Sequence, residues 1–324
     1  MTELRENIPI DMRQAVEACN VRCEAILEEH LQKVEAQKTP SVIYHYTDEA
    51  GFLGILKSRR IRLTDMFGLN DPSELQYGLI HACEVLEEQS TTAHPAAAVF
   101  SKKFREVVGD KFCKVAHFFV ACFSKSQDDL GQWRAYGNDG KGFALGFDGA
   151  LLENAFVQPG KESARGNATF HVNYDDSLLR SLHRQLVKEV LSLIGLPKGR
   201  DLNDMIINEF MKELSVVLGL HAIRASIFFK HKAYKNEEEF RFLQLRELNG
   251  SLEDLKQRVR NYSFIRFAEF DWMSKNQSVL REIFIGPAAD QVAAKLFVQN
   301  CLRDNGFDEE KITIKCSTIP YRNA

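Results

Sequence analysis

The feature that most constrains the fold is a long helical pattern set between predicted strands. From 177 to about 229, apolar residues recur at helical spacing, with one interruption at 195–199. Strand-like runs lie on either side of it, at 168–174 and 238–246. We therefore interpret 176–230 as a helical insertion within one domain, and the chain as an α+β protein.

Patterning elsewhere predicts the remaining elements. Apolar residues at helical spacing over 10–36 predict an amphipathic N-terminal helix, which ends at Thr39 and Pro40. Further strands are expected at 42–46, 61–64, 115–123, 142–147, 263–269, 282–285 and 311–316, and further helices at 52–56, 70–89, 126–136 and 290–304.

Three expectations about organisation follow. We interpret 1–40 as an N-terminal helical segment and 41–324 as a single α+β domain. The stretch 90–98 is expected to be a loop. The strand at 263–269 is expected to pair with the strand at 238–246.

Charge and composition narrow the functional classes. The net charge of −3 argues against a general nucleic-acid or membrane-surface binder, although it is compatible with one local basic patch. No apolar run reaches the ~18 residues needed to cross a bilayer. The seven cysteines include no C-x-x-C pair, so we expect reduced, mostly buried thiols and a cytoplasmic location.

Several common catalytic motifs are absent from the sequence. It contains no P-loop, no G-x-G-x-x-G after a strand, no H-E-x-x-H and no G-x-S-x-G. The nine histidines show no metal-ligand spacing, so no metal is expected. Cys122 lies in an apolar strand, which favours a buried, inert thiol over a nucleophile.

The end of the first predicted strand carries the first candidate ligand residues. His45 offers both a donor and an acceptor, which suits ribose hydroxyls, and Tyr46 and Thr47 follow it. The alternative is a half-buried aromatic strand end in which Thr47 caps the next helix.

A second candidate lies at the start of the helix predicted near residue 70. Asp71 at the N-cap, Pro72 at the first helical position and Glu74 two residues later account for a capping box. The capping box does not account for Asn70, and its side-chain amide is a candidate for pointing into a cleft.

A short predicted helix carries the third group. Ser126 is expected to cap it and Gly137 to end it. Trp133 is expected in the core. Arg134 is a candidate contact for a phosphate, with an exposed salt bridge as the alternative, and Tyr136 lies on the same helix. The following strand, 142–147, has one face of glycine and alanine, which would let another backbone or a ligand come close.

The fourth group lies where the charge switches from basic to acidic, just after Tyr234. With a period of two, Glu237, Glu239 and Arg241 share one strand face. A carboxylate beside a cation stays ionised at pH 7, and it can stabilise an oxocarbenium-like transition state. The alternative is a solvated charge run at an edge strand. A register step of one residue would exchange the two faces, so the choice between Glu237 and Glu239 stays open.

Eight short motifs follow one another along the chain, and in combination they indicate a family more specifically than any one of them does. They lie at residues 44–47, 69–74, 122–124, 132–137, 140–147, 238–241, 285–287 and 317–321. In this order they resemble a widespread bacterial family of unknown function, over residues 42–321.

A second resemblance is to ADP-ribosyltransferases, nearest to their DNA-modifying and RNA phosphotransferase-like branches. It rests on His45 at the end of a first strand, followed by a short helix and a second strand, and on Glu239 followed by Phe240 at the start of a late strand. The resemblance implies a split mixed β-sheet core and a cleft that binds NAD as a substrate.

The same resemblance implies a role for each residue. His45 would hold the adenosine ribose, and Glu239 would engage the nicotinamide ribose. Arg134 or Arg62 would hold the pyrophosphate. The aromatic that stacks on nicotinamide is one of Tyr46, Tyr77, Tyr136 and Tyr234.

The implied activity is transfer of ADP-ribose to a macromolecule, either protein or nucleic acid, or hydrolysis of NAD. Such an activity fits a toxin, effector or phage-defence role, with no membrane partner. The rival hypothesis is a non-catalytic nucleotide-sensing or protein-interaction module. The acceptor, and whether the chain forms a homo-oligomer, are left open.

Overall fold

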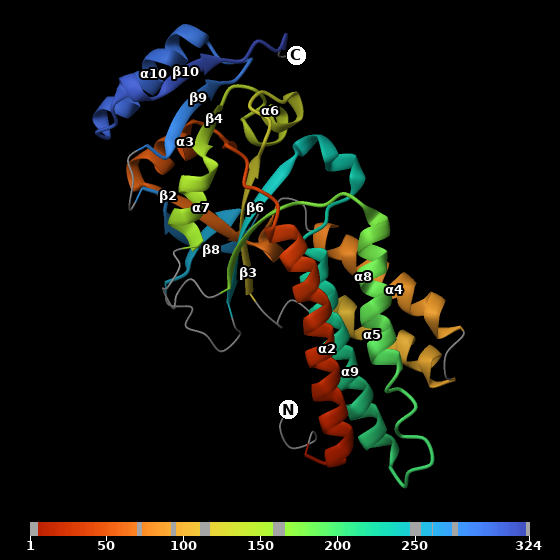
Figure 1. Cartoon of the computed structure of the whole chain (residues 1–324). Helices are drawn as coiled ribbons and strands as arrows, with labels where there is room; N and C mark the ends of the chain where they lie inside the picture. Colours follow the sequence, from red (N-terminus) through yellow and green to blue (C-terminus); the bar gives the residue numbers. More distant parts are fainter. Residues whose placement is uncertain are drawn as a thin grey trace. The chain divides into compact units, whose positions relative to one another are not determined.

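The computed structural model describes residues 6–69, 73–91, 95–110, 117–157, 166–246, 254–260, 262–273 and 278–321. It shows an α+β protein with a mixed sheet and several helices, which confirms the predicted class (Figure 1). The chain divides into two compact units. The helical unit comprises Met1–Ala36, Asn70–Ala116 and Asn173–Lys232, and the sheet unit comprises Gln37–Leu69, His117–Val172 and Ala233–Ala324.

The helical unit is built from α2 (Ile10–Glu35), α4 (Ser73–Ser90), α5 (Ala96–Asp110), α8 (Asp176–Leu191) and α9 (Asp204–Ser226). α8 packs against α2, α4 and α9. The unit therefore contains the N-terminal helix, α4 and α5 in addition to the insertion predicted at 176–230. In the described ranges, every helix is too short or too polar to cross a bilayer.

α5 differs from the sequence prediction, which has a loop at 90–98 and no helix before the strand at 115–123. The helix begins at Ala96 because three successive alanines favour helix formation. Phe100 and Phe104, one turn apart, then bury stacked rings on one side of the helix. The alanines add little to an amphipathic pattern at the start of this helix, and the helix was not predicted.

The sheet unit holds ten strands within the described residues, in the order β10-β9-β4-β1-β3-β2-β8-β7, with β6 paired to β3 and β5 to β6. Their bounds are β1 (Val42–Thr47), β2 (Arg60–Asp65), β3 (His117–Ser124), β4 (Phe143–Asp148), β5 (Asn167–His171), β6 (Glu239–Arg246), β7 (Lys256–Arg260), β8 (Ser263–Asp271), β9 (Leu280–Ile285) and β10 (Thr313–Cys316). Only β9 and β10 pair in parallel among these strands. The helices of this unit are α3 (Glu49–Ser58), α6 (Leu130–Tyr136), α7 (Gly149–Val157) and α10 (Gln291–Asp304).

The sheet divides at β3, which has three neighbouring strands. β6 pairs with β3 along its whole length, from His117 to Ser124. The other edge of β3 is shared. β1 meets it at Ser124, and β2 meets it at Phe119 and Val120. β1 and β2 therefore diverge on the same side of β3.

The two faces of the sheet carry different side chains. One face holds the main core, which includes Ile43, Phe123 and Leu145 and is covered by α3, α7 and α10. The opposite face holds a smaller cluster beside α6, made of Tyr44, Tyr46, Trp133, Ala144 and Phe284. Successive residues of β1 thus alternate between the two clusters, as the pleat of a strand requires.

Two pairing and capping predictions are wrong. β8 pairs with β2 and β7, not with β6, because β3 and β5 already occupy both edges of β6. The N-cap of α6 is Asp129, not Ser126: Asp129 Oδ1 accepts from the Gln132 amide at 2.9 Å. The Ser126 carbonyl instead accepts from the Tyr46 hydroxyl. Gly137 does follow α6, with φ of −95°.

The bare face of β4 is filled by the protein itself. A Cβ on Gly142 would lie 2.2 Å from the Thr47 carbonyl oxygen, and one on Gly146 would lie 2.9 Å from the Tyr44 ring. The missing side chains therefore allow β1 and β4 to approach each other.

Replacing Gly142 with alanine is expected to destabilise the sheet unit by about 1–3 kcal/mol, because β1 would have to move away from β4. The matched control is Gly54→Ala in α3. A Cβ there meets nothing within 4 Å, so this change should stabilise by about 0.5–1 kcal/mol. Urea denaturation measures both. A Gly142→Ala variant as stable as the parent would contradict the close packing.

Candidate functional site

A buried ion pair at the start of β6 is the chemically most distinctive feature of the sheet unit. Glu239 is 5% exposed and Arg241 is 0% exposed. Arg241 Nε donates to Glu239 Oε1 at 2.6 Å, and Nη2 donates to Oε2 at 3.1 Å. This two-pronged geometry fixes the orientation of the Glu239 side chain.

The neighbours of Glu239 across the sheet are Ser124 and Tyr44. Ser124 lies opposite Glu239 on β3, and Tyr44 lies opposite Ser124 on β1, so all three share one face. The Ser124 hydroxyl donates to the Glu237 carbonyl at 2.7 Å. The Tyr44 hydroxyl donates to Glu282 at 2.5 Å, and burial together with this carboxylate raises the pKa of Tyr44, which keeps the phenol neutral.

Sequence reasoning did not single out Ser124 or Tyr44, although both lie in the motifs at 44–47 and 122–124. Only the strand register shows that they form a row with Glu239.

His45 lies on the other face of the sheet. Its ring is 5.6 Å from that of Phe123, which belongs to the main core. His45 Nδ1 is 3.1 Å from the Cys122 carbonyl oxygen, and because a carbonyl only accepts, Nδ1 carries the proton. Burial lowers the pKa of His45, so the ring is neutral at pH 7 and Nε2 is an acceptor. The structure does not bring His45 and Glu239 onto one face.

Tyr46 and Thr47 have structural partners. Tyr46 is buried; its hydroxyl donates to the Ser126 carbonyl at 2.9 Å, and its ring packs edge-on against Trp133 at 4.7 Å. Thr47 ends β1, but Asp48, not Thr47, caps α3 by accepting from the Gly51 amide.

The remaining predicted residues are spread over the surface of the sheet unit. Arg134 and Tyr136 are exposed on α6, and Tyr234 is exposed on the short 3-10 helix Lys232–Glu237. Glu237 ends that helix and so lies outside β6. Glu238 has φ of +43° and turns the chain between the two glutamates. Glu237 therefore does not extend the strand face that Glu239 shares with Arg241, contrary to the prediction.

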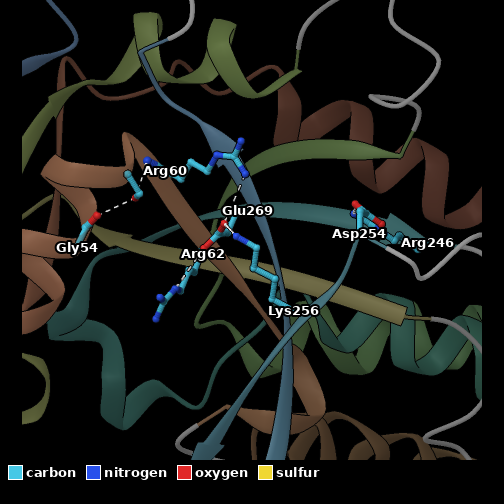
Figure 2. A network of polar contacts seen from close by, with 8 residues as sticks. Gly54, Arg60, Arg62, Arg246, Asp254, Lys256 and Glu269 are labelled. Atoms are coloured by element: carbon cyan, nitrogen blue, oxygen red, sulfur yellow. Dashed lines mark hydrogen bonds and ion pairs between the residues drawn. The ribbon is translucent and has the colours of Figure 1, made fainter.

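Three further predicted residues lie elsewhere. Asn70 falls outside the described residues. Tyr77 belongs to the helical unit, where its hydroxyl donates to Asp176. Arg62 Nε is 3.4 Å from Glu269 (Figure 2). Its guanidinium also lies over the Phe267 ring at 4.7 Å, so Arg62 already has partners. No group of three His, Cys, Asp or Glu side chains suited to a metal occurs in the described part of the chain.

The motif at 132–137, Gln-Trp-Arg-Ala-Tyr-Gly, is largely explained by packing. Trp133 is fully buried, and its Nε1 donates to Asp128 at 2.7 Å. The other carboxylate oxygen of Asp128 accepts from the Thr318 amide, which ties α6 to the C-terminal segment. The family comparison begins at this motif, with Gln132, and extends to Phe242. Residues 132–242 match the DUF2971 domain, which is described as a protein of unknown function.

The DUF2971 domain includes the buried Glu239–Arg241 pair but not β1 with His45. For these residues, the resemblance to a family of unknown function is confirmed. No curated protein and no solved structure matches the chain.

Proposed function

We propose that the sheet unit binds NAD and that Glu239 acts on the nicotinamide ribose. The protein would then transfer ADP-ribose to a protein or nucleic acid, or hydrolyse NAD. The observation that carries this proposal is the buried Glu239 carboxylate, held by two hydrogen bonds from Arg241. The choice of NAD as the substrate rests on the resemblance to ADP-ribosyltransferases. His45 and the pair Glu239 and Phe240 carry that resemblance.

A purely stabilising role is a weak explanation for this pair. Apolar residues of similar volume are often as stabilising as a buried ion pair, because both charges lose their hydration. A fixed carboxylate in a water-poor site is suited to stabilising positive charge on a transition state. A buried carboxylate with a specific charged partner is therefore a candidate for chemistry.

The divided sheet also supports the proposal. The resemblance implies a split mixed sheet, and β1 and β2 diverge from one edge of β3. His45 lies beside β3 near this divergence, with a neutral ring whose Nε2 can accept from a ribose hydroxyl. Arg134 is an exposed cation that could meet the pyrophosphate.

The proposed reaction breaks the bond between C1′ of the ribose and the nicotinamide nitrogen. The electron pair of this bond leaves with nicotinamide. Glu239 accepts a hydrogen bond from a ribose hydroxyl and stabilises the oxocarbenium-like cation. An acceptor oxygen or nitrogen, or water, then bonds to C1′ and gives up a proton.

The second candidate is the non-catalytic nucleotide-sensing or protein-interaction module. The observation that favours it is the placement of His45 and Glu239 on opposite faces of the sheet. A binding module needs no convergence of these two side chains on one ribose.

Nicotinamide release from NAD, followed by proton NMR, tests the enzyme proposal. We expect release by the wild type and a loss of about 10²-fold or more in Glu239→Gln, because the amide cannot stabilise the cation. The matched control is Glu153→Gln. Glu153 lies in the same unit, and its carboxylate accepts hydrogen bonds from the hydroxyls of Thr39 and Thr169. This control should retain release.

The same samples separate the two candidates. A rise in melting temperature with NAD but no nicotinamide release would favour the sensing module, because ligand binding to the native state alone raises stability. If the protein shows no nicotinamide release and no thermal shift, both NAD turnover and NAD binding are ruled out.

A further inference from the structure

Strand β7 has a backbone edge that is open to another chain. It is the last strand of the sheet, and among the described strands it pairs only with β8. Arg260 lies opposite Ser263, and so short a hairpin closes on a hydrogen-bonded pair. Because such pairs recur at every second residue of an antiparallel ladder, Gln257 and Val259 direct their N–H and C=O groups away from β8. A further extended chain could pair with these groups.

One face of β7 is cationic. Lys256, Arg258 and Arg260 alternate along the strand and share this face. Lys256 Nζ lies 2.7 Å from Glu269 (Figure 2). Arg260 Nη2 donates to two backbone carbonyls at 2.7 and 2.9 Å, and this side chain has a further contact. Two of the three cations therefore have partners within the protein.

Arg258 is the cation of this face that a partner can use. The acids of the face, Glu269 and Asp271, lie further along β8 than Ile265, the residue that pairs with Arg258. Arg258 is exposed, and within the described ranges no carboxylate lies at ion-pair distance from it. Partial burial and the positive charges of two other arginines lower its pKa. A carboxylate placed beside Arg258 would therefore be attracted to it.

The other face of β7 is apolar near the turn. Val259 is 69% exposed, and Phe264, opposite it on β8, is 75% exposed. Exposed apolar side chains at a sheet edge favour association, which most edge strands avoid. A second copy of β7 is a poor partner, because antiparallel pairing centred on Arg258 would place like charges beside each other.

We propose that the free edge of β7 binds an extended peptide of a partner protein, in which acidic and apolar residues alternate. The peptide adds a strand to the sheet, and its backbone pairs with Gln257 and Val259. Successive side chains of a strand point to opposite faces. The carboxylates therefore meet Arg258 on one face, and the apolar side chains extend the row of Val259 and Phe264 on the other. This proposal does not depend on the NAD chemistry.

Fluorescence anisotropy of the full chain with a labelled heptapeptide, Glu-Val-Glu-Leu-Glu-Val-Glu, tests the proposal. The wild type should bind it about ten-fold or more tightly than the same peptide with lysine at each glutamate. Methylating every second backbone nitrogen removes the donors on one side of the peptide. One of the two alternately methylated peptides should therefore bind about ten-fold more weakly, and the other should bind as before.

Two variants of β7 test its two contributions. Arg258→Glu should weaken binding of the acidic peptide about ten-fold, because attraction becomes repulsion. Val259→Pro removes an N–H that makes no bond to β8, so it should weaken binding about five-fold or more without unfolding the sheet. The matched control is Lys295→Glu, which reverses an exposed charge on α10 in the same unit and should leave binding unchanged.

Circular dichroism melting checks that each variant folds. Absence of binding by the wild type at millimolar peptide would overturn the proposal. Equal binding of the two methylated peptides, or an equal loss in Lys295→Glu, would also overturn it. A wild-type dimer in sedimentation equilibrium that Val259→Pro dissociates would assign the edge to a second copy instead.

Discussion

Replacing Arg241 with methionine is expected to lower the free energy of unfolding by about 3–5 kcal/mol, the largest single effect that we predict. The substitution leaves the Glu239 carboxylate buried without its two hydrogen bonds. Removing the charged partner of a buried charge costs far more than the pair itself contributes. Guanidinium chloride denaturation, with its midpoint and slope, measures the change.

The double variant Glu239→Leu with Arg241→Met is the decisive comparison. It removes both charges and keeps apolar volume, so it should be more stable than Arg241→Met alone. If the double variant is instead less stable than the single one, the pair itself holds the fold together. The interpretation that Glu239 is retained for chemistry would then lose its physical basis.

The second large effect is a loss of stability in mild acid, caused by buried histidines of the helical unit. Burial lowers the pKa of His183 to about 3 and that of His221 to about 4. Between pH 6.5 and these values, the unfolded chain binds protons that the native histidines do not. Stability is therefore fully present above about pH 6.5 and falls as the pH drops toward 4 and 3, by up to ~1.4 kcal/mol per pH unit for each histidine.

Thermal melting between pH 7 and pH 4 measures this loss. His183→Leu should flatten the acid dependence, because the unfolded variant no longer gains that proton. His171→Gln, a partly exposed histidine of the sheet unit, is the control and should keep the full slope. An unchanged slope in His183→Leu would assign the acid sensitivity to other groups.

Local patterns predict most elements of this protein, but not α5, α7 or β7. The helix at 10–36 and the strands at 42–46 and 142–147 all occur within one residue of their expected bounds. Their signals are local, because helical spacing and strand alternation depend on neighbours in the chain. α5 was not predicted, and its first turn contains alanines, which fit a helix but show no apolar stripe.

The candidate site was only partly predictable. Glu239 and Arg241 share a face because they lie two apart in one strand, as a period of two requires. Glu237 does not join them, since a residue with positive φ lies between, and the charge pattern carries no sign of that turn. Asp48 and Asp129, not Thr47 and Ser126, turned out to be the helix caps.

By itself, the sequence determined the class of the fold, the order of most of its helices and strands, and the shared strand face of Glu239 and Arg241; α5, α7 and β7 were not predicted. The predicted features follow from periodicity and from charges two residues apart. Only the tertiary structure decided which strands are neighbours: β8 joins β2, and β3 has three partners. It also decided that His45 and Glu239 point to opposite faces, because facing depends on register between strands far apart in the chain.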